Sequence, residues 1–379
     1  MTPIEIININ TRLATKDDDH IPCYDHTRLD AINTCPTWGI VRYSMHKRMP
    51  GAGRQMALEA GTAGHDGFAA VKLFQFWKRQ VEGPLPEPDE VWSSVDRPSV
   101  AQFFFHGARI FGEERFTKML GAVDASSSER TQCISFCLEA LYSGEFFDDP
   151  DDKRRTVSNI SEGLIAYIDR WDMDRYPIWV RDPNDPNSDI GIEVTLNIVV
   201  TLEYREIDLR SDFKQLTQKK TFRLIGKIDG LVWDRDKLMI VENKTTTMNL
   251  ADVWLSQWIM SHQITGYCIT AGTWAGAQVD RALIEGMKIP MPKNIADGIR
   301  KEDVDRNAEM YRKWGEWVIH TIEIDDAYRD VPLRAPQYPH ACNRYFHTCS
   351  FLPLCAAKDE QEKVQILEEM ELDRWDPLA

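Results

Sequence analysis

The chain has no run of about 20 uninterrupted apolar residues, which a membrane-spanning helix would require. Its start combines neither a basic segment nor an apolar core, so it does not resemble a secretion signal. Internal repeats and low-complexity tracts are also absent from the 379 residues. We therefore expect a cytoplasmic protein without a membrane partner, built as one large domain or two ordinary ones.

An excess of positive charge is also missing, since the formal net charge is −15 at pH 7. Proteins that coat nucleic acid over their whole surface depend on many Lys and Arg contacts to phosphate, and this charge argues against that class. Much of the acid lies in short runs at 17–19 and 148–152, where we expect solvated loops. Local basic residues could still steer a phosphate backbone. They are Arg42, His46, Lys47, Arg48 and Arg54.

Helical periodicity dominates the first half of the chain. Apolar residues recur at helical spacing in five stretches, which predict helices at 27–49, 54–79, 99–120, 128–142 and 156–171. Closely spaced prolines with Asn and Asp predict loops at 83–90 and 181–189. Three neighbouring phenylalanines, Phe103, Phe104 and Phe105, are predicted to be core residues, with stacking on the bases of single-stranded DNA as the alternative.

The second half of the chain has a composition typical of β-strands. β-Branched and aromatic residues predict strands at 191–204, 221–234 and 237–246, with the turn sequence D-R-D-K between the last two. We predict a helix at 252–272, a strand at 281–289, a charged helix at 301–322 and a loop-like tail at 332–354. This order indicates an α/β fold with one mixed central sheet flanked by helices. It also suggests four parts, at 1–82, 83–189, 190–330 and 331–379, of which the second is a helical insertion.

The strongest functional signal is G-K-I-D-G at 226–230, followed after the turn by E-N-K at 242–244. On a strand, Glu242 and Lys244 leave the same face, and the turn would bring Asp229 towards them. Two carboxylates can bind a hard divalent cation such as Mg²⁺, and an ammonium group can stabilise charge that develops on a phosphate. The residues predict metal-dependent phosphodiester hydrolysis. The alternative is a surface ion pair beside a turn aspartate.

The order G-x-x-D, hairpin, E-x-K, then a helix with Gln and Tyr four residues apart resembles the RecB-like branch of the PD-(D/E)xK nuclease superfamily. The helical pair here is Gln263 and Tyr267, one turn apart and so on one face. The resemblance implies a restriction-endonuclease-like fold, a catalytic centre at Asp229, Glu242 and Lys244, and substrate-holding roles for Gln263 and Tyr267. A buried Gln and a core Tyr are the alternative.

The same branch carries a metal-site histidine on a helix of the N-terminal part. The sequence offers His65, preceded by Gly61 and Gly64, and imidazole can bind Mn²⁺ or Mg²⁺ beside carboxylates. The neighbouring Asp66 would point elsewhere on a helix. The resemblance therefore implies a metal site made by His65, Asp229, Glu242 and the backbone carbonyl of Asn243. It also gives Glu193 a supporting place around that site.

Eight cysteines in a cytoplasmic chain do not indicate a disulfide framework. One lies upstream of the expected core and three downstream, as in the iron-sulfur members of this branch: Cys35, Cys342, Cys349 and Cys355. Four thiolates suit a 4Fe-4S cluster, which would join the two ends of the chain. The spacing C-x6-C-x5-C has a longer first gap than is frequent in helicase-linked relatives. Zinc with His340 or His347, and plain buried cysteines, are the alternatives. We predict that Cys23, Cys133, Cys137 and Cys268 are unliganded.

These signals predict a Mg²⁺- or Mn²⁺-dependent deoxyribonuclease, in particular an exonuclease that acts on single strands or DNA ends. The resemblance implies a place in recombination, repair or CRISPR spacer processing, with phage origin among the options. No G-x-x-x-x-G-K-[ST] motif occurs, so unwinding would come from a helicase, recombination or CRISPR-adaptation partner. The alternatives are a structure-specific endonuclease and a non-catalytic nucleic-acid-binding subunit with the same fold.

Overall fold

The computed structural model describes residues 4–49, 56–81, 98–185, 187–207, 217–344 and 347–375. The chain forms two compact units, each from discontinuous segments. Unit 1 comprises 1–54, 196–226 and 307–379, and unit 2 comprises 55–195 and 227–306. Strands β4 (Ile192–Glu206) and β5 (Gln218–Asp234) each have one end in each unit. Arg54 and the loop predicted at 83–90 lie outside the described residues, as does residue 186 of the second loop.

The sheet of unit 2 consists of the C-terminal half of β5 with β6 (Lys237–Thr246), β7 (Val279–Lys288) and β8 (Ile299–Asp305). Strands β5 and β6 form an antiparallel hairpin, whose turn holds Arg235 at a positive φ of 60°. Strand β7 pairs parallel to β6, and β8 pairs antiparallel to β7. A parallel pair needs a crossover connection, which α8 (Asp252–Ile259) and α9 (His262–Ala275) provide here.

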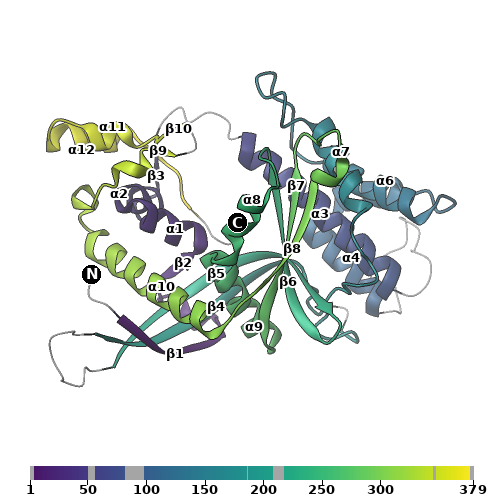
Figure 1. Ribbon diagram of the computed structural model, residues 1–379, viewed down its shortest axis with the longest axis horizontal. Coiled ribbons are helices and arrows are strands. Elements are labelled where there is room, and N and C mark those ends of the chain that lie inside the picture. The colour runs from purple at the N-terminus through teal and green to yellow at the C-terminus, as the bar shows by residue number, and fades with distance from the viewer. Residues whose placement is uncertain are drawn as a thin grey trace. The chain divides into compact units, whose positions relative to one another are not determined.

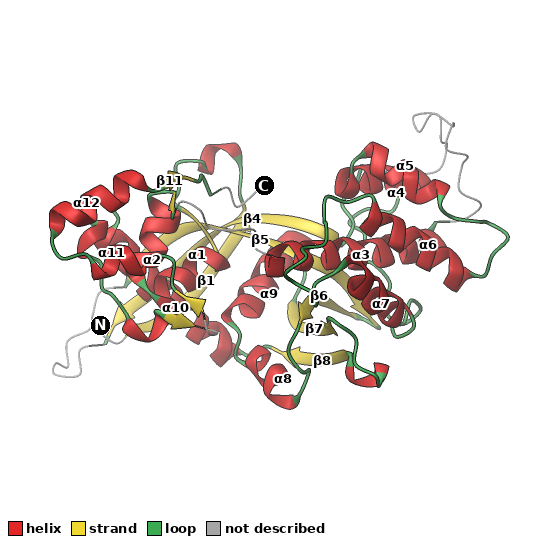
Figure 2. Cartoon of the chain, turned by 90° about the horizontal axis from the view of Figure 1, so that it is seen from above, coloured by secondary structure: helices red, strands yellow, loops and turns green. Residues whose placement is uncertain are grey.

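Helices cover both faces of these strands. Figure 2 shows α8 and α9 on one side of β6, β7 and β8, and α3 and α7 on the other. Helices α3 and α7 belong to a helical layer on this second side. The layer contains α3 (Met56–Gln80), α4 (Pro98–Phe111), α5 (Glu113–Gly121), α6 (Glu129–Tyr142) and α7 (Val157–Ile168). A short 3-10 turn, η4 (Ile295–Asp297), precedes β8. Burial of aromatic rings stabilises this helical layer; the rings include Phe68, Phe74, Phe103, Phe116 and Phe136.

Unit 1 brings the first and last segments of the chain together (Figure 1). Strand β1 (Ile4–Leu13) pairs antiparallel with β4, and β2 (Cys23–Asp25) pairs parallel with β5. The buried carboxylate of Asp325 on α10 accepts hydrogen bonds from Tyr24, Arg28 and Ser44 at 2.8–2.9 Å. This network joins α10 (Ala308–Tyr328) to β2, α1 (His26–Thr34) and the turn after α2.

The smaller elements of unit 1 are short helical turns and two-residue strands. In the N-terminal segment they are η1 (Lys16–Asp18), α2 (Pro36–Gly39), η2 (Ile40–Ser44) and β3 (Lys47–Arg48). In the C-terminal segment they are η5 (Pro332–Arg334), η6 (Pro339–Ala341), β9 (Asn343–Arg344), β10 (His347–Thr348), α11 (Leu352–Ala356), α12 (Glu360–Glu369) and β11 (Glu371–Leu372). Strand β11 pairs with β3, so the two ends of the chain also meet there. Within the described ranges, no helix combines the length and apolarity needed to cross a bilayer.

The predicted α/β fold with a mixed sheet flanked by helices is confirmed. The helix predicted at 301–322 is wrong at its start, because 301–305 belongs to β8, and α10 begins only at Ala308. Charged residues are common on sheet edges, where they discourage pairing with other chains, so the run K-E-D-V-D did not look like a strand. Strand β1 was not predicted.

Three predicted helices are interrupted. The helix predicted at 27–49 breaks at Cys35, whose backbone is extended (φ −156°, ψ 106°) because Pro36 disfavours the helical conformation of the residue before it. The helix at 99–120 divides at Gly112, which has a φ of 80°. The helix at 252–272 divides before Ser261, whose hydroxyl caps α9. Phe103 and Phe104 are core residues as predicted, but Phe105 is 44% exposed.

Candidate active site

The candidate site begins with a close approach between helix α3 and strand β6. A Cβ at Gly64 would lie 2.5 Å from Thr245 Cγ2, so only glycine permits the observed packing there. The next residue, His65, then reaches strand β5. Its Nδ1 forms a hydrogen bond of 2.9 Å with Asp229 Oδ1. The glycine before the predicted histidine therefore has a structural reason.

Asp229 is buried, and each of its carboxylate oxygens takes part in a hydrogen bond. Its second oxygen, Oδ2, accepts a hydrogen bond of 2.7 Å from the backbone N–H of Asn243. Burial alone would raise the pKa of Asp229, but the charge and hydrogen bond of His65, with the charges of Lys72 and Lys244, lower it to about 2. Burial lowers the pKa of His65, yet the carboxylate of Asp229 outweighs this effect and the net pKa is raised.

Glu193 on β4 completes a group of three potential ligands. Ligand atoms of His65, Glu193 and Asp229 all lie within 4.8 Å of one another. Glu193 has a φ of 49°, a backbone conformation that is rare outside glycine and that clusters at functional sites. One oxygen pairs with Lys227 at 2.8 Å, while the other is buried without a hydrogen-bond partner in the described part of the chain. Burial and the charge of Asp229 raise the pKa of Glu193.

The E-N-K segment of β6 supplies an ion pair beside this group. Lys244 Nζ lies 2.5 Å from Glu242 Oε1, and the ammonium stands 5.4 Å from the centre of the Trp258 ring. Burial and the charge of Asp229 raise the pKa of Glu242 to about 7, although Lys244 opposes the shift. Burial would lower the pKa of Lys244, but the carboxylates of Glu242 and Asp229 raise it. Asp229, Glu242 and Lys244 thus influence one another electrostatically, although Glu242, a predicted metal ligand, is not part of the group formed by His65, Glu193 and Asp229.

A buried polar network supports β6 from the opposite face. Lys72 on α3, which is fully buried, donates to Asn243 Oδ1 at 2.5 Å. Asn243 Nδ2 in turn donates to Glu285 Oε2 at 3.0 Å, and that oxygen also accepts from the hydroxyl of Tyr167 at 2.5 Å. The other oxygen of Glu285 pairs with Lys301 at 2.8 Å. Buried Lys72 and half-buried Lys301 therefore balance carboxylates around the candidate site.

Gln263 and Tyr267 lie together on α9, as predicted from their spacing. Gln263 Nε2 donates to the hydroxyl of Tyr267 at 3.1 Å. Helix α9 packs against β6, the strand that carries Glu242 and Lys244. Asp66, which the sequence analysis set aside, instead pairs with Arg115 at 2.7 Å and is not part of the three-ligand group.

The model that describes the PD-(D/E)XK nuclease superfamily matches residues 26–356. This chain belongs to the PD-(D/E)XK nuclease superfamily. Superfamily members are generally nucleases, and they typically use Mg²⁺ or Mn²⁺.

The other comparisons add less. None of the curated proteins is significantly similar to the chain. Among solved structures, the one described as "Crystal structure of SSO0001" is similar to this superfamily member over 44% of its chain, with 17% identity and a TM-score of 0.25. The match spans 60% of that protein, which is less than two thirds of its length.

Two residues of this superfamily member were undervalued or missed in the sequence. Glu193 was given only a supporting place, but the structure sets its carboxylate beside His65 and Asp229. Lys72 was not considered. It lies seven residues, or about two helical turns, after His65, so the two share a face of α3. A lysine within the apolar run A-A-V-K-L-F was the available signal, because buried lysines are rare without a partner.

The four predicted cluster cysteines all belong to unit 1. Burial raises the pKa of Cys355 to about 11, and the nearby thiols of Cys35, Cys349 and Cys342 add to this shift. Burial, together with the nearby thiols of Cys35 and Cys342, also raises the pKa of Cys349. Cys349 N–H also donates to the carbonyl of Cys342 at 2.8 Å. The structure therefore brings these four thiols into one neighbourhood.

Zinc would require a tighter arrangement. Tetrahedral coordination with Zn–S bonds of about 2.3 Å places sulfurs roughly 3.8 Å apart. Among the described residues, the only group of three or more potential ligands with all atoms within 4.8 Å is the His65 group, which contains no cysteine. The ring of His340 stacks on Tyr338, and the side chain of His347 lies outside the described residues.

Proposed function

We propose that this chain is a divalent-metal-dependent deoxyribonuclease of the RecB-like branch, acting as an exonuclease on single strands or DNA ends. The convergence of His65, Glu193 and Asp229 beside the Glu242–Lys244 pair carries this proposal. Membership in the nuclease superfamily supports the chemistry. The substrate class and the mode of cutting are the parts that need experiment.

The residues present fit a hard divalent cation. Carboxylate oxygens and one imidazole are suitable ligands for Mg²⁺ or Mn²⁺. The buried oxygen of Glu193 with no hydrogen-bond partner in the described residues is a position that a cation would satisfy. His65, Glu193 and Asp229 would hold the ion, and Glu242 and the carbonyl of Asn243 would complete its surroundings as the resemblance implies. A cation bound there would neutralise negative charge on the attacked phosphate.

The remaining groups position the substrate and its charge. The ammonium of Lys244 is held by Glu242 next to the site, where it can stabilise charge that develops on the phosphate. Lys72 holds Asn243 from the other face of β6 and so fixes the backbone that donates to Asp229. The amide of Gln263 and the hydroxyl of Tyr267 are proposed to hold the nucleotide.

A nuclease assay with two matched substrates tests the proposal. Wild-type protein with Mg²⁺ or Mn²⁺ should degrade end-labelled linear single-stranded DNA and leave covalently closed circular DNA intact. Lys244→Ala and Asp229→Ala should each lose at least about 100-fold in rate, the usual effect of removing one charge-stabilising group. Asp66→Asn is the control, because Asp66 adjoins His65 but pairs with Arg115. Full activity in Asp229→Ala would overturn the assignment.

The two alternatives predict different results. Cutting of closed circular DNA would indicate an endonuclease with the same chemistry. Tight binding of DNA without cutting in either metal would indicate a non-catalytic subunit. The retained Asp229, Glu242 and Lys244 favour an active enzyme, since a binding subunit has no physical need for this costly buried set of charges.

We also propose that Cys35, Cys342, Cys349 and Cys355 hold a 4Fe-4S cluster. Their interacting thiols support it, and four thiolates suit such a cluster. Protein purified without oxygen should be brown and contain iron. Stoichiometric zinc would instead support the alternative.

A further inference from the structure

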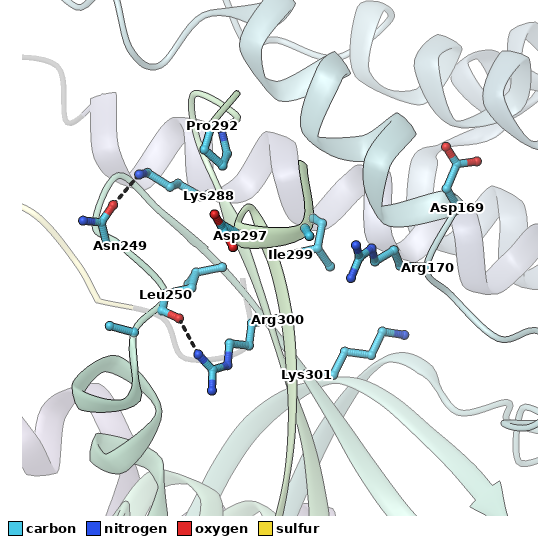
Figure 3. Close-up of a pocket in the computed structure, with 12 residues that line it drawn as sticks. Asp169, Arg170, Asn249, Leu250, Lys288, Pro292, Asp297, Ile299, Arg300 and Lys301 are labelled. Atoms are coloured by element: carbon cyan, nitrogen blue, oxygen red, sulfur yellow. Dashed lines mark hydrogen bonds between the residues drawn. The ribbon is translucent and has the colours of Figure 1, made fainter. Parts of the chain in front are cut away.

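A cavity of about 950 Å³ lies in unit 2, beside the edge strand of the sheet. The loop before α8, the segment that leads to β8, β8 itself and the end of α7 surround it (Figure 3). Its charged lining is predominantly basic: Arg170, Lys288, Arg300 and Lys301, against Asp169 and Asp297. Such a volume accommodates a small ligand or part of a polymer.

The register of the strands relates this cavity to the candidate active site. Lys244 on β6 pairs with Gly286 on β7, and Gly286 pairs with Arg300 on β8. Residues directly opposite one another share a face of the sheet, and Lys288 shares it too, two positions after Gly286. Because neighbouring strands are about 4.8 Å apart, the backbones of Lys244 and Arg300 are roughly 10 Å apart.

The cavity is nevertheless a separate subsite. A Cβ at Gly286 would meet Trp254 at 2.6 Å and Leu250 at 2.8 Å, so these two side chains cover the sheet between Lys244 and Arg300. A ligand in the cavity therefore does not need to touch the catalytic groups. The cavity lies at the sheet edge and is lined from both faces. Arg300 and Lys288 come from the face that carries Lys244, whereas Lys301, which pairs with Glu285, and Arg170, which follows α7, come from the other face.

Two of the cations are left for a ligand. Lys288 donates to the neutral amide oxygen of Asn249 at 2.5 Å, which leaves its charge uncompensated (Figure 3). Arg170 is exposed and forms no ion pair with the acidic groups in the described ranges. Asp169 is already paired with Arg130 at 2.5 Å, while Asp297 accepts a hydrogen bond of 3.0 Å from the neutral amide of Asn294 and keeps its charge. The four cations of the lining therefore outnumber its acidic charges.

The other two cations are held in place. Lys301 pairs with the buried Glu285 at 2.8 Å and stands 4.7 Å from the Trp171 ring centre. Arg300 donates to the carbonyl of Leu250 at 3.1 Å and pairs with Asp252, whose side chain is 92% exposed. Exposed pairs of this kind contribute little and are readily exchanged for a phosphate.

We propose that this cavity binds a backbone phosphate of the DNA strand that the candidate active site cuts, with Arg170 and Lys288 as its main contacts. The proposal depends on the proposed nuclease function and names a further contact of the same substrate. The roughly 10 Å between the backbones of Lys244 and Arg300 places this phosphate within a few nucleotides of the scissile bond. The cavity would hold the strand in register without reading its sequence.

Binding of a labelled 12-nucleotide single strand, measured in EDTA over a series of KCl concentrations, tests the phosphate contacts. Each phosphate contact to a single strand contributes about 0.7 to the slope of log affinity against log salt concentration. The double variant Arg170→Gln/Lys288→Gln should therefore bind about tenfold more weakly and lose about 0.7 from the slope, the contribution of one phosphate. The matched control Lys118→Gln/Arg154→Gln, which removes the same charge from exposed positions of unit 2, should match the wild type.

A short substrate separates this inference from the proposed function. Thymidine 5′-(p-nitrophenyl phosphate) is too short to span the two subsites, so both double variants should hydrolyse it at the wild-type rate in Mn²⁺. An unchanged slope in Arg170→Gln/Lys288→Gln, or an equal loss in the control variant, would overturn the phosphate site alone. Failure of the wild type to bind or cut DNA would overturn the nuclease proposal, and this inference with it.

Discussion

At the scale of single residues, the buried carboxylate of Glu242 links function to stability. Its pKa of about 7 lies above the ordinary value of 4.5, so the folded protein holds this proton more tightly than the unfolded chain does. The associated stability is present below about pH 4.5 and is lost as the pH rises through about 7. The raised pKa of His65 likewise makes the stability fall as the pH rises. The lowered pKa of Asp229 instead makes the stability fall only as the pH drops towards about 2.

Without divalent cations, the free energy of unfolding should therefore fall between pH 5 and pH 8. The contribution of Glu242 is up to about 3 kcal/mol, at about 1.4 kcal/mol for each unit of pKa shift. Urea denaturation in EDTA, at several pH values, measures it. Glu242→Gln should show a smaller fall than the wild type and should be the more stable protein at pH 8. Equal falls in both proteins would show that burial does not raise the pKa of Glu242.

Lys72 gives a second prediction at this scale. Its ammonium is buried among the carboxylates of Asp229, Glu285, Glu193 and Glu242, whose charges oppose the lowering of its pKa by burial. Lys72→Met should cost about 3–5 kcal/mol of stability, because it leaves buried acids uncompensated. Lys118→Met, which breaks only an exposed pair, should keep wild-type stability.

A double variant checks the cause. Glu285→Gln removes one of the charges that Lys72 offsets, so Lys72→Met/Glu285→Gln should lose less stability than the sum of the two single variants. Strict additivity would mean that the cost of Lys72→Met comes from lost packing rather than from charge.

The sequence indicated the candidate residues only where motifs are local. Asp229, Glu242 and Lys244 follow from one hairpin, and Gln263 and Tyr267 follow from one helical turn. The contact of Lys72 with Asn243 spans 171 positions, and no periodicity within α3 indicates it. The importance of Glu193 depends on an unusual backbone conformation within β4, which neither its residue type nor its alternation predicts.

At the scale of elements, the packing of α3 on β6 determines whether His65 reaches Asp229. A methyl group at Gly64 would meet Thr245 Cγ2 at 2.5 Å, whereas one at Gly61 would lie 3.7 Å from Thr245 Oγ1, an ordinary contact. Gly61→Ala should keep its activity and gain up to about 1 kcal/mol from helix propensity. Gly64→Ala should lose at least about tenfold in nuclease rate, because small displacements of catalytic groups are costly.

Rescue identifies the clash as the cause. Thr245→Ser removes the methyl group in question, so Gly64→Ala/Thr245→Ser should recover most of the rate of Thr245→Ser alone, measured in the linear single-strand assay. If the double variant remains as slow as Gly64→Ala, the loss does not arise from the contact with β6.

The helix breaks were not predicted, but unlike strand pairing they have causes that are local in the sequence. The helix breaks at Cys35, Gly112 and Ser261 each have a local cause: a following proline, a glycine at positive φ and a capping serine. Strand β8 has none, since its charged residues become a strand only through pairing with β7. Strand β1 likewise depends on β4, nearly 200 residues away in the chain.

At the scale of the whole molecule, the chain builds both units from interleaved segments. The four consecutive parts suggested by the sequence remain a prediction. Changes in composition along the chain show where helical periodicity gives way to strand-like sequence, but they carry no information on which distant segments pack together. The cysteines are an exception, because their placement at both ends of the chain suggested that these ends meet, and both belong to unit 1.

The proposed cluster should therefore stabilise unit 1 as a long-range cross-link. A link between Cys35 and Cys342 closes a loop of about 300 residues, worth roughly 5 kcal/mol in the chain-entropy description used for disulfides. Cys355→Ser should lose iron and brown colour and should unfold at lower urea concentration. Cys23→Ser, also half-buried in unit 1 but outside the group, should keep wild-type iron content.

Because His65, Glu193 and Asp229 belong to unit 2, Mn²⁺ binding measured by calorimetry should survive in Cys355→Ser wherever the protein remains folded. Wild-type iron content in that variant would remove Cys355 from the cluster, and loss of Mn²⁺ binding in folded protein would mean that the cysteines support the catalytic site directly.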